Sequence, residues 1–183
     1  MASKSPRRHQ LMHECGYTFT VQVQDTDEDF DPAMPALEVA PFLAQKKAHA
    51  CRNFLKTPVE ILLTADSVVV IDGDVLNKPA DYNEAFAMIR RLSGNMHTVV
   101  TGVCLLDSAK EIVFKDETKV WLAAMTDEAI DYYVKNYAPF DKAGSYGIQD
   151  WIGLTHIARI DGSYSNVMGL PTAKVYQYLQ SFL

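Results

Sequence analysis

The chain has 183 residues, of which 48% are hydrophobic and 22% are charged, and its formal net charge is −6. These values suit one soluble globular domain, or one domain with two lobes. The acidic balance argues against a nucleic-acid partner drawn in by the field of the whole molecule. No apolar run is long enough to cross a bilayer, and residues 1–8 lack the apolar core of a signal peptide. Three scattered cysteines fit a reducing compartment and argue against a disulfide framework or a zinc cluster.

The first predicted helix presents two arginines in its first turn. Ser5 is a good N-cap, Pro6 suits the first helical position, and Gly16 closes the helix just after its last turn. Arg7 and Arg8 therefore stand at the end where the helix dipole favours anions. Two arginines beside free backbone N–H groups indicate a phosphate cradle, and the alternative is a solvated basic turn.

Alternating hydrophobicity predicts a strand at Tyr17–Val23, which an acidic loop follows at residues 25–29. Loops of this kind are usually only solvated, but oxygen-rich loops also hold Mg²⁺. A helix is expected at about Pro41–Phe54, because proline fits only near a first turn. Lys46 and Lys47 project from this helix in adjacent directions, so at most one of them needs to face a ligand.

The central apolar stretch places one carboxylate inside a predicted strand region. Two β-branched runs, Ile61–Leu63 and Val68–Ile71, flank Asp66. A buried charge costs several kcal/mol unless it is paired or bound to a cation. The Asp72-Gly73 turn folds the chain back, so that Lys78 can return towards Asp66. An acid and a base at strand ends suggest a site, and the alternative is that Asp66 merely caps a turn between two strands.

Beyond this turn the chain alternates between predicted helices and strands. In order these are a helix capped by Asp81, strands at His97–Leu106 and Glu111–Ala124, a helix capped by Thr126, a strand at Leu154–Ile160 and a helix from Pro171. Because a hairpin loop at residues 107–110 intervenes, the sheet is expected to be mixed rather than purely parallel. The predicted fold class is α/β.

Residues 141–149 form an irregular segment with glycines and polar groups. Glycines allow a ligand to approach the backbone closely, and Lys142 and Gln149 offer donors. The sequence has no P-loop, no G-x-G-x-x-G fingerprint and no G-x-S-x-G elbow. What remains is a strand carboxylate, an acidic loop and dispersed cations, a combination that suits phosphoryl or nucleotidyl chemistry with Mg²⁺.

Six blocks of the sequence resemble the Maf proteins, a family named for septum formation. The blocks are Ser3-Lys4-Ser5-Pro6-Arg7-Arg8, Ala65-Asp66-Ser67, Lys78-Pro79, Leu92-Ser93-Gly94-x-x-His97-x-Val99-x-Thr101-Gly102, Asp141 to Gln149, and Gly169-Leu170-Pro171. They occur in the family's order and cover essentially the whole chain. The resemblance implies a nucleoside triphosphate pyrophosphatase, which releases a nucleoside monophosphate and pyrophosphate. It also implies the fold shared with inosine triphosphate pyrophosphatases, in which residues 1–183 would form one domain with a twisted mixed sheet, two lobes and a deep central cleft.

The resemblance also implies roles for individual residues. Asp66 would accept the proton of the attacking water and, with Glu28, hold a divalent cation, Mg²⁺ or Mn²⁺. The positions linked to substrate choice would be Arg7, Ser67 and Gln149. The phosphate-facing groups would be Ser5, Arg8, Lys47, Lys78 and Lys142.

The Arg7-Arg8 pair, together with Tyr146-Gly147-Ile148-Gln149, resembles the branch of the family that acts on dTTP and UTP. The branch that acts on 7-methyl-GTP usually has a tryptophan after the first proline and lacks the second segment. Some positions depart from the family pattern: the first strand is expected to be stunted, Ser67 replaces a threonine, and Lys46 replaces a glutamate or glutamine.

The expected protein is therefore a cytoplasmic pyrophosphatase for dTTP, UTP and modified pyrimidine nucleotides. Its partner would be the small-molecule nucleotide, with no nucleic acid and no membrane, and the resemblance implies a homodimer. The alternatives are a nucleotide-binding regulator of cell division with little catalysis, the 7-methyl-GTP branch, and a weaker RNA-binding reading against which the acidic charge argues.

Overall fold

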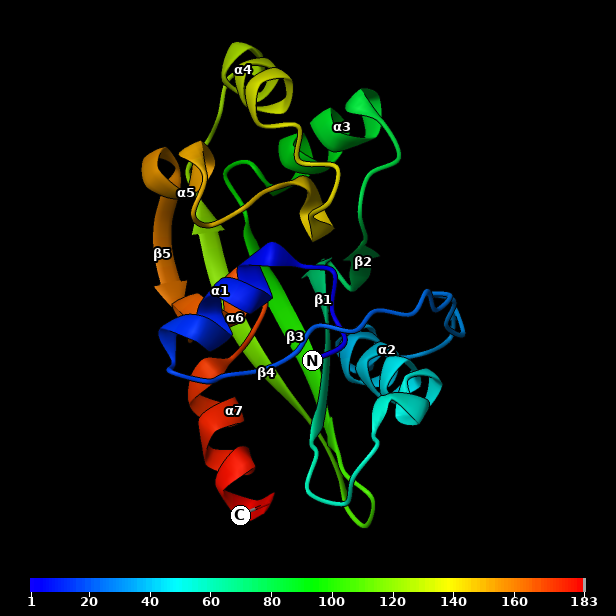
Figure 1. Cartoon of the computed structure of the whole chain (residues 1–183). Coiled ribbons are helices and arrows are strands. Elements are labelled where there is room, and N and C mark those ends of the chain that lie inside the picture. Colours follow the sequence, from blue (N-terminus) through cyan, green and yellow to red (C-terminus); the bar gives the residue numbers. More distant parts are fainter. Residues whose placement is uncertain (183) are drawn as a thin grey trace. The chain divides into compact units, whose positions relative to one another are not determined.

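The computed structural model describes residues 1–182 and confirms the α/β class (Figure 1). The α-helices are α1 (Pro6–Glu14), α2 (Ala36–Ala50), α3 (Tyr82–Leu92), α4 (Asp127–Tyr137), α5 (Trp151–Thr155), α6 (Tyr164–Met168) and α7 (Thr172–Leu179). The strands are β1 (Leu62–Ile71), β2 (Asp74–Leu76), β3 (Met96–Leu106), β4 (Glu111–Leu122) and β5 (Ile157–Asp161). Short 3₁₀ helices occur at η1 (Arg52–Phe54), η2 (Ala143–Ser145) and η3 (Gln180–Phe182).

The five strands form one sheet in the order β2-β1-β3-β4-β5. The β1–β2 pair is antiparallel, and its hairpin closes through Asp72 and Gly73, whose φ angles are 53° and 86°. Two successive positive φ values belong to the tight turns that match strand twist, as the Asp-Gly signal predicts. The β4–β5 pair is also antiparallel. The prediction that the sheet is not purely parallel is confirmed, and both of its edge pairs are antiparallel.

The chain divides into two compact units. Unit 1 comprises Met1–Ser67, Thr101–Asp116 and Gly169–Leu183, and unit 2 comprises Val68–Val100 and Glu117–Met168. The boundaries fall inside β1, β3 and β4, so each of these strands contributes residues to both units.

In unit 1, helix α2 packs closely on the sheet. A side chain added at Gly102 of β3 would lie 2.2 Å from the backbone nitrogen of Pro41. Only glycine permits this approach, because the atoms it faces are backbone and cannot yield. The buried hydroxyl of Thr64 in β1 donates to the carbonyl oxygen of Ala44 at 2.7 Å. These contacts fix α2, and with it the lysines it carries, against β1 and β3.

The start of α2 corrects the prediction that Pro41 stands in a first turn. The helix begins at Ala36, and Pro41 lies inside it. An internal proline leaves the carbonyl four residues earlier without its helical donor. That carbonyl belongs to Leu37, and it accepts a hydrogen bond from Lys115 Nζ at 3.4 Å. The ammonium of Lys115 also pairs with Glu38 at 2.7 Å. A hydrogen-bond donor from β4 thus compensates for the internal proline. The residues next to Pro41 in the sequence give no sign of this donor.

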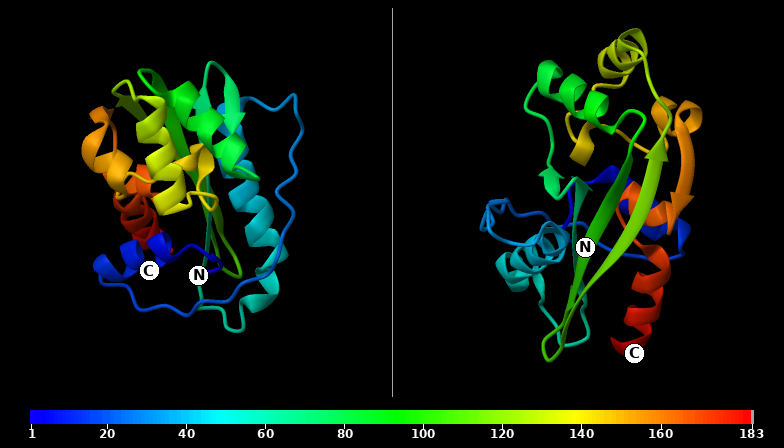
Figure 2. Two further views of the ribbon diagram at one scale, coloured as in Figure 1. Left: turned by 90° about the horizontal axis from the view of Figure 1, so that it is seen from above. Right: turned by 180° about the vertical axis from the view of Figure 1, so that it is seen from behind.

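Unit 2 holds the pair of helices that shapes the second group of site residues. Helices α3 and α4 lie side by side (Figures 1 and 2) and share a core that includes Ile89, Ile130 and Tyr133. Their starts are as predicted, since Asp81 accepts from Glu84 N at 2.9 Å and Thr126 accepts from Ala129 N at 3.3 Å. Capping groups of this kind stabilise a helix end by about 1 kcal/mol.

Two further predictions about secondary structure need correction, and one element was missed. Residues 17–23 form no strand, and the side chains of Val21 and Val23 are 45% and 42% exposed. The predicted strand Leu154–Ile160 begins instead within α5 and becomes β5 only at Ile157. Helix α6 was not predicted at all. In each case a short apolar pattern is too brief to distinguish a strand, a helix and a loop.

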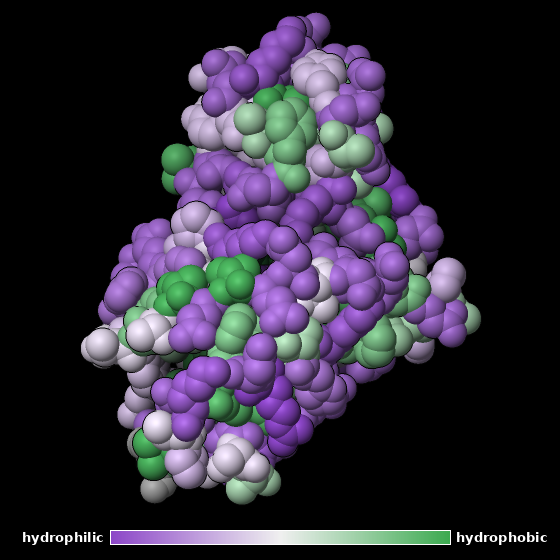
Figure 3. All heavy atoms as spheres, turned by 45° about the vertical axis from the view of Figure 1, so that its right-hand side comes forward, coloured by the Kyte–Doolittle hydropathy of each residue, from purple (hydrophilic) through white to green (hydrophobic). Residues whose placement is uncertain are grey.

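The surface is mainly hydrophilic on the face shown in Figure 3, where hydrophobic residues occur in smaller separate patches. Within residues 1–182, none of the helices has the length and hydropathy needed to cross a membrane.

Candidate active site

Asp66 lies in the middle of β1 and is 7% exposed. Ala65 before it is buried, Ser67 after it is partly exposed, and β1 runs without a break through Asp66. The two runs predicted as separate strands are therefore one strand, and the alternative that Asp66 caps a turn is wrong. A carboxylate at such a position requires a cationic partner.

That partner is Lys47 on α2. Its ammonium pairs with the carboxylate of Asp66 and, at 2.8 Å, with Oε1 of Glu28 in the acidic loop. Burial by itself would lower the pKa of Lys47, but the two carboxylates outweigh burial and raise it. The ammonium is therefore charged under physiological conditions. Lys46 instead donates to Asp27 and to the backbone of Asp29, so only one of the two adjacent lysines reaches Asp66.

The two carboxylates beside Lys47 suit a divalent cation that also binds the phosphates of a ligand. Asp66 and Glu28 contact the same ammonium, so their carboxylates lie close to one another. Mg²⁺ is usually bound by one or two carboxylates together with substrate phosphates and water, rather than by a closed protein cage. Residues 1–182 contain no group of three or more His, Cys, Asp or Glu side chains that could hold a metal. Two adjacent carboxylates therefore fit a metal that binds together with a nucleotide.

The first turn of α1 carries Ser5, Arg7 and Arg8. Ser5 is the predicted N-cap, and its hydroxyl accepts from Arg8 N at 3.5 Å. Arg7 follows Pro6 directly and is partly exposed. Ser5 and Arg7 thus stand at the N-terminus of α1, and the phosphate cradle predicted for Arg7 and Arg8 stays a prediction.

Arg8 contacts the protein rather than projecting from the helix. Its guanidinium donates to Gly169 O at 2.7 Å, to Ala65 O at 2.9 Å and to Ser67 Oγ at 2.8 Å. Burial lowers the pKa of Arg8, and the carboxylate of Asp66 opposes this effect. Two of the three bonds go to the residues on either side of Asp66. Sequence reasoning assigned Arg8 to phosphate and did not find this anchoring role.

Ser67 completes the surroundings of Asp66 within unit 1. Its hydroxyl contacts Arg8 and also lies 2.9 Å from Thr101 Oγ1. Thr101 occurs in one of the sequence blocks but had no predicted role. Its contact with Ser67 shows that a hydroxyl at position 67 has a structural partner within the protein, besides any ligand.

In unit 2 the structure brings together the segments that carry Lys78 and Lys142. Gly144 N donates to Asn77 O at 3.2 Å, which ties the irregular segment to the residue before Lys78. Gly144 has a φ of 66°, and a side chain there would come within 2.8 Å of Val69. Two of the predicted phosphate-facing lysines thus lie on adjoining stretches of backbone.

Lys142 and Gln149 lie at the two ends of the same segment. Lys142 pairs with Asp141 at 2.8 Å and lies 3.6 Å from Oδ2 of Asp150. The side-chain oxygen of Gln149 is buried and has no hydrogen-bond partner among residues 1–182. A buried acceptor without a donor costs about 1–3 kcal/mol, so this oxygen favours a ligand that brings a donor.

Three further residues support this segment and were not predicted: His97 and Tyr133 are buried, and Asp150 is partly exposed. His97 Nε2 lies 2.6 Å from Tyr146 OH, and burial lowers the pKa of His97 to about 4. Tyr133 OH donates to Asp150 Oδ2 at 2.8 Å. His97 stands in one of the family blocks, which was the only available signal, and neither Tyr133 nor Asp150 lies in a block.

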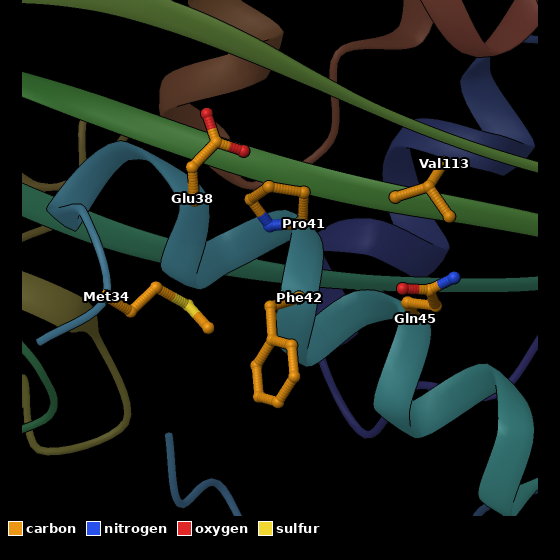
Figure 4. Close-up of a pocket in the computed structure, with 6 residues that line it drawn as sticks. All are labelled: Met34, Glu38, Pro41, Phe42, Gln45 and Val113. Carbon is orange, nitrogen blue, oxygen red and sulfur yellow. The ribbon is translucent and has the colours of Figure 1, made fainter. Parts of the chain in front are cut away.

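A hollow of about 230 Å³ lies beside α2, lined by Met34, Glu38, Pro41, Phe42, Gln45 and Val113 (Figure 4). None of the predicted site residues lines it, and its lining includes no lysine or arginine that could attract a triphosphate. We therefore do not identify it with the active site.

Comparison with known proteins supports the sequence blocks. The family model of the Maf-like proteins matches residues 1–182. A dTTP/UTP pyrophosphatase of Flavobacterium psychrophilum is 46% identical over 179 residues, which is 98% of this chain and 91% of the relative. Proteins of the same name from Flavobacterium johnsoniae and from Porphyromonas gingivalis strain W83 are 43% and 44% identical, over the full chain and 94% and 92% of their own lengths. The chain belongs to the Maf-like protein family.

Proposed function

We propose that this protein hydrolyses dTTP and UTP to the nucleoside monophosphate and pyrophosphate. The relatives that share 41–46% of its sequence are named dTTP/UTP pyrophosphatases, and this name is the first support. The observation on the chain itself that carries the proposal is the buried carboxylate of Asp66, paired with Lys47 and close to Glu28.

In the proposed reaction Asp66 accepts a proton from a water molecule. The water oxygen forms a bond to the α-phosphorus, the bond from that phosphorus to the bridging oxygen breaks, and pyrophosphate leaves with the electron pair. Arg8 holds the backbone of Ala65 and the side chain of Ser67, so the carboxylate between them keeps its orientation. Fixing a general base in this way lowers the barrier by positioning.

The remaining candidate residues would bind the substrate. Hydrogen-bond donors or positive charge for the phosphates would come from Ser5, Lys47, Lys78 and Lys142. The choice of substrate would depend on Arg7 and Gln149. The resemblance supports these assignments, and the position of Ser5 and Arg7 at the N-terminus of α1 supports them physically. Asp66 and Glu28 are the residues that would hold Mg²⁺ or Mn²⁺. A divalent cation there would neutralise charge on the phosphates.

The cytoplasm is the compartment we propose, because the substrates are nucleotides and the sequence has scattered cysteines. Cys15, Cys51 and Cys104 are all free thiols. The homodimer implied by the family resemblance stays a prediction, which light scattering of the purified protein would check.

The proposal is tested by measuring pyrophosphate release from dTTP, UTP, CTP, 7-methyl-GTP and the purine triphosphates, with Mg²⁺, Mn²⁺ or a chelator. Asp66→Asn is measured beside the wild type, and its kcat should fall by about 10²–10⁴ because the base is lost. Asp116→Asn is the matched control. Asp116 is another strand carboxylate with a lysine partner, Lys174 at 2.6 Å, and it lies outside the proposed site.

Hydrolysis of dTTP and UTP that disappears in Asp66→Asn and persists in Asp116→Asn is the expected result. Turnover of 7-methyl-GTP alone would overturn the proposed substrates while retaining Asp66 as the base. A folded wild type that binds nucleotides but releases no product with any metal would overturn the enzyme assignment. That outcome would favour a nucleotide-binding regulator.

A further inference from the structure

Tyr133 places a polar group inside the core of unit 2. Its side chain is fully buried and its ring stacks on Tyr137, with centroids 5.0 Å apart. The hydroxyl donates to Asp150 Oδ2 at 2.8 Å and accepts from Gly147 N at 3.1 Å. Burial raises the pKa of Tyr133, and the carboxylate of Asp150 raises it further. The phenol therefore stays protonated and remains a donor to Asp150.

The carboxylate of Asp150 also faces Lys142. Its Oδ2 atom accepts from Tyr133 and lies 3.6 Å from the ammonium of Lys142. The side chains of Asp150 and Lys142 are only 16% and 12% exposed, so their attraction is less screened by water than a surface pair. Asp141 pairs with the same ammonium at 2.8 Å from the exposed side. Lys142 is thus held between an inner and an outer carboxylate.

The segment between Lys142 and Asp150 closes tightly on this carboxylate. A side chain added at Gly147 would come 2.6 Å from Asp150 Oδ2. Gly147 N is also the group that donates to the Tyr133 hydroxyl, and Gly147 O accepts from Asp150 N at 3.1 Å. One phenol and one carboxylate therefore fix both the backbone turn and the lysine at its start.

We propose that Tyr133 and Asp150 are positioning residues that hold the ammonium of Lys142 in place for the phosphates of the substrate. The inference rests on the proposed function, in which Lys142 is one of the phosphate-binding groups. A free lysine side chain must be immobilised when a ligand binds, and the loss of its rotamer freedom opposes binding. Fixing the ammonium beforehand removes part of that cost from the binding step.

A purely structural role of the Tyr133 hydroxyl has a different consequence. It would stabilise unit 2 without affecting the strength of phosphate binding by the folded protein. The two roles are separated by the Michaelis constant and by ligand affinity, because unfolded molecules reduce the apparent kcat and leave these quantities unchanged.

The test is a double-mutant cycle between Tyr133→Phe and Lys142→Met. For each variant we would measure KM and kcat for dTTP, and the Kd of inorganic triphosphate by calorimetry. Tyr133→Phe should raise KM and Kd about tenfold with kcat within about twofold, the effect of losing one hydrogen bond to a charged group. In the Lys142→Met background the same change should have no further effect. Tyr137→Phe is the matched control, one helical turn away and stacked on the same ring, and should leave both constants unchanged.

Unchanged constants in Tyr133→Phe, or effects that add fully to those of Lys142→Met, would overturn the inference. If circular dichroism shows that Tyr133→Phe is unfolded at the assay temperature, Asp150→Asn replaces it, and its effect on Kd must likewise vanish in Lys142→Met. A wild type that binds triphosphate but hydrolyses neither dTTP nor UTP would refute the proposed function alone. The Kd values of the same cycle would then decide the positioning role.

Discussion

The guanidinium of Arg8 donates a hydrogen bond of 2.8 Å to the hydroxyl of Ser67, the residue that follows Asp66 in β1. A second bond of 2.9 Å goes to the carbonyl oxygen of Ala65, the residue before it. A planar guanidinium offers donors in a fixed fork, so both flanks of the carboxylate are held in one geometry. Arg8 therefore fixes the position of the proposed base, Asp66, and also places a positive charge near it.

Replacing Arg8 with lysine tests this role. The substituted side chain would keep the charge but could not reach Gly169, Ala65 and Ser67 together. We expect kcat for dTTP to fall at least about tenfold, because a small misplacement of the base is costly. Arg91→Lys is the control, since Arg91 also joins a carbonyl, Ile71 O at 3.2 Å, and a side chain, Asp74 at 2.7 Å. A kcat that is the same in Arg8→Lys and Arg91→Lys would contradict the anchoring role.

The ion pair of Lys47 with Asp66 should appear in the pH dependence of stability. The pKa of Lys47 is raised in the folded protein, against the burial that would lower it, by the carboxylates of Asp66 and Glu28. The folded state therefore holds this proton more tightly than the unfolded chain does. The resulting stabilisation is complete below pH 10.5, the ordinary lysine value, and is lost as the pH rises through the higher folded value.

Urea unfolding of wild type and Lys47→Met from pH 7 to pH 11 measures this effect. The difference in unfolding free energy between the two proteins should be constant up to about pH 10 and should shrink above it. Lys46→Met removes an exposed ammonium that pairs with Asp27, and such surface pairs contribute little. If the wild type loses its greater unfolding free energy over Lys47→Met already between pH 7 and pH 9, the difference does not come from the charge of Lys47.

Local signals in the sequence identified much of the fold. The N-cap Ser5, the Asp72-Gly73 turn and the cap Asp81 each act through neighbouring residues, and each lies where it was predicted. Pro41 was misplaced because its tolerance depends on Lys115, which reaches the carbonyl of Leu37 across 78 positions of the sequence. The contacts that set the role of Arg8 join it to Ala65 and Ser67, 57 and 59 residues along the chain. Position-by-position reading cannot supply such long-range partners.

In the candidate site, too, some residues could be predicted from the sequence and others only from contacts made in the fold. The family blocks and the wider resemblance led to Asp66, Glu28 and Lys47, which the structure brings together. They did not lead to Tyr133 or Asp150, because a buried tyrosine in a helical pattern predicts a core residue. Its hydroxyl acquires a role only when the fold brings a carboxylate to it.

His97 should make the folded protein sensitive to acid. Burial lowers the pKa of His97 from 6.5 to about 4, and the group that faces its Nε2 is the hydroxyl of Tyr146, whose own pKa burial raises. Between these two pH values the unfolded chain binds a proton that the folded protein excludes. Stability therefore falls as the pH drops from about 7 to 4, by roughly 3 kcal/mol from this group.

His97→Gln keeps a polar group of similar length near Tyr146 and removes the titration. Chemical denaturation at several pH values should show that this variant loses less stability towards pH 4 than the wild type does, by about the same amount. His13→Gln is the control, because His13 is exposed on α1. Parallel stability curves for wild type and His97→Gln would contradict the assignment of this acid sensitivity to His97.

The side-chain oxygen of Gln149 connects stability with substrate choice. It is buried and accepts no hydrogen bond from residues 1–182, so the ligand-free protein bears the cost of an unsatisfied acceptor. Gln149→Met removes that acceptor at nearly constant volume, and we expect a melting temperature equal to or above that of the wild type. If the oxygen receives a donor from the base of the nucleotide, the same variant should lose preference for dTTP and UTP over CTP by about tenfold or more in kcat/KM.

Gln45→Met on α2 controls for the change of side chain, since its amide donates to Glu111 at 2.5 Å on the exposed surface. If Gln149→Met melts at a lower temperature and keeps its substrate preference, Gln149 is a packing residue. If Gln149→Met is stable and less selective, the unsatisfied acceptor of Gln149 lowers the stability of the fold but contributes to substrate recognition.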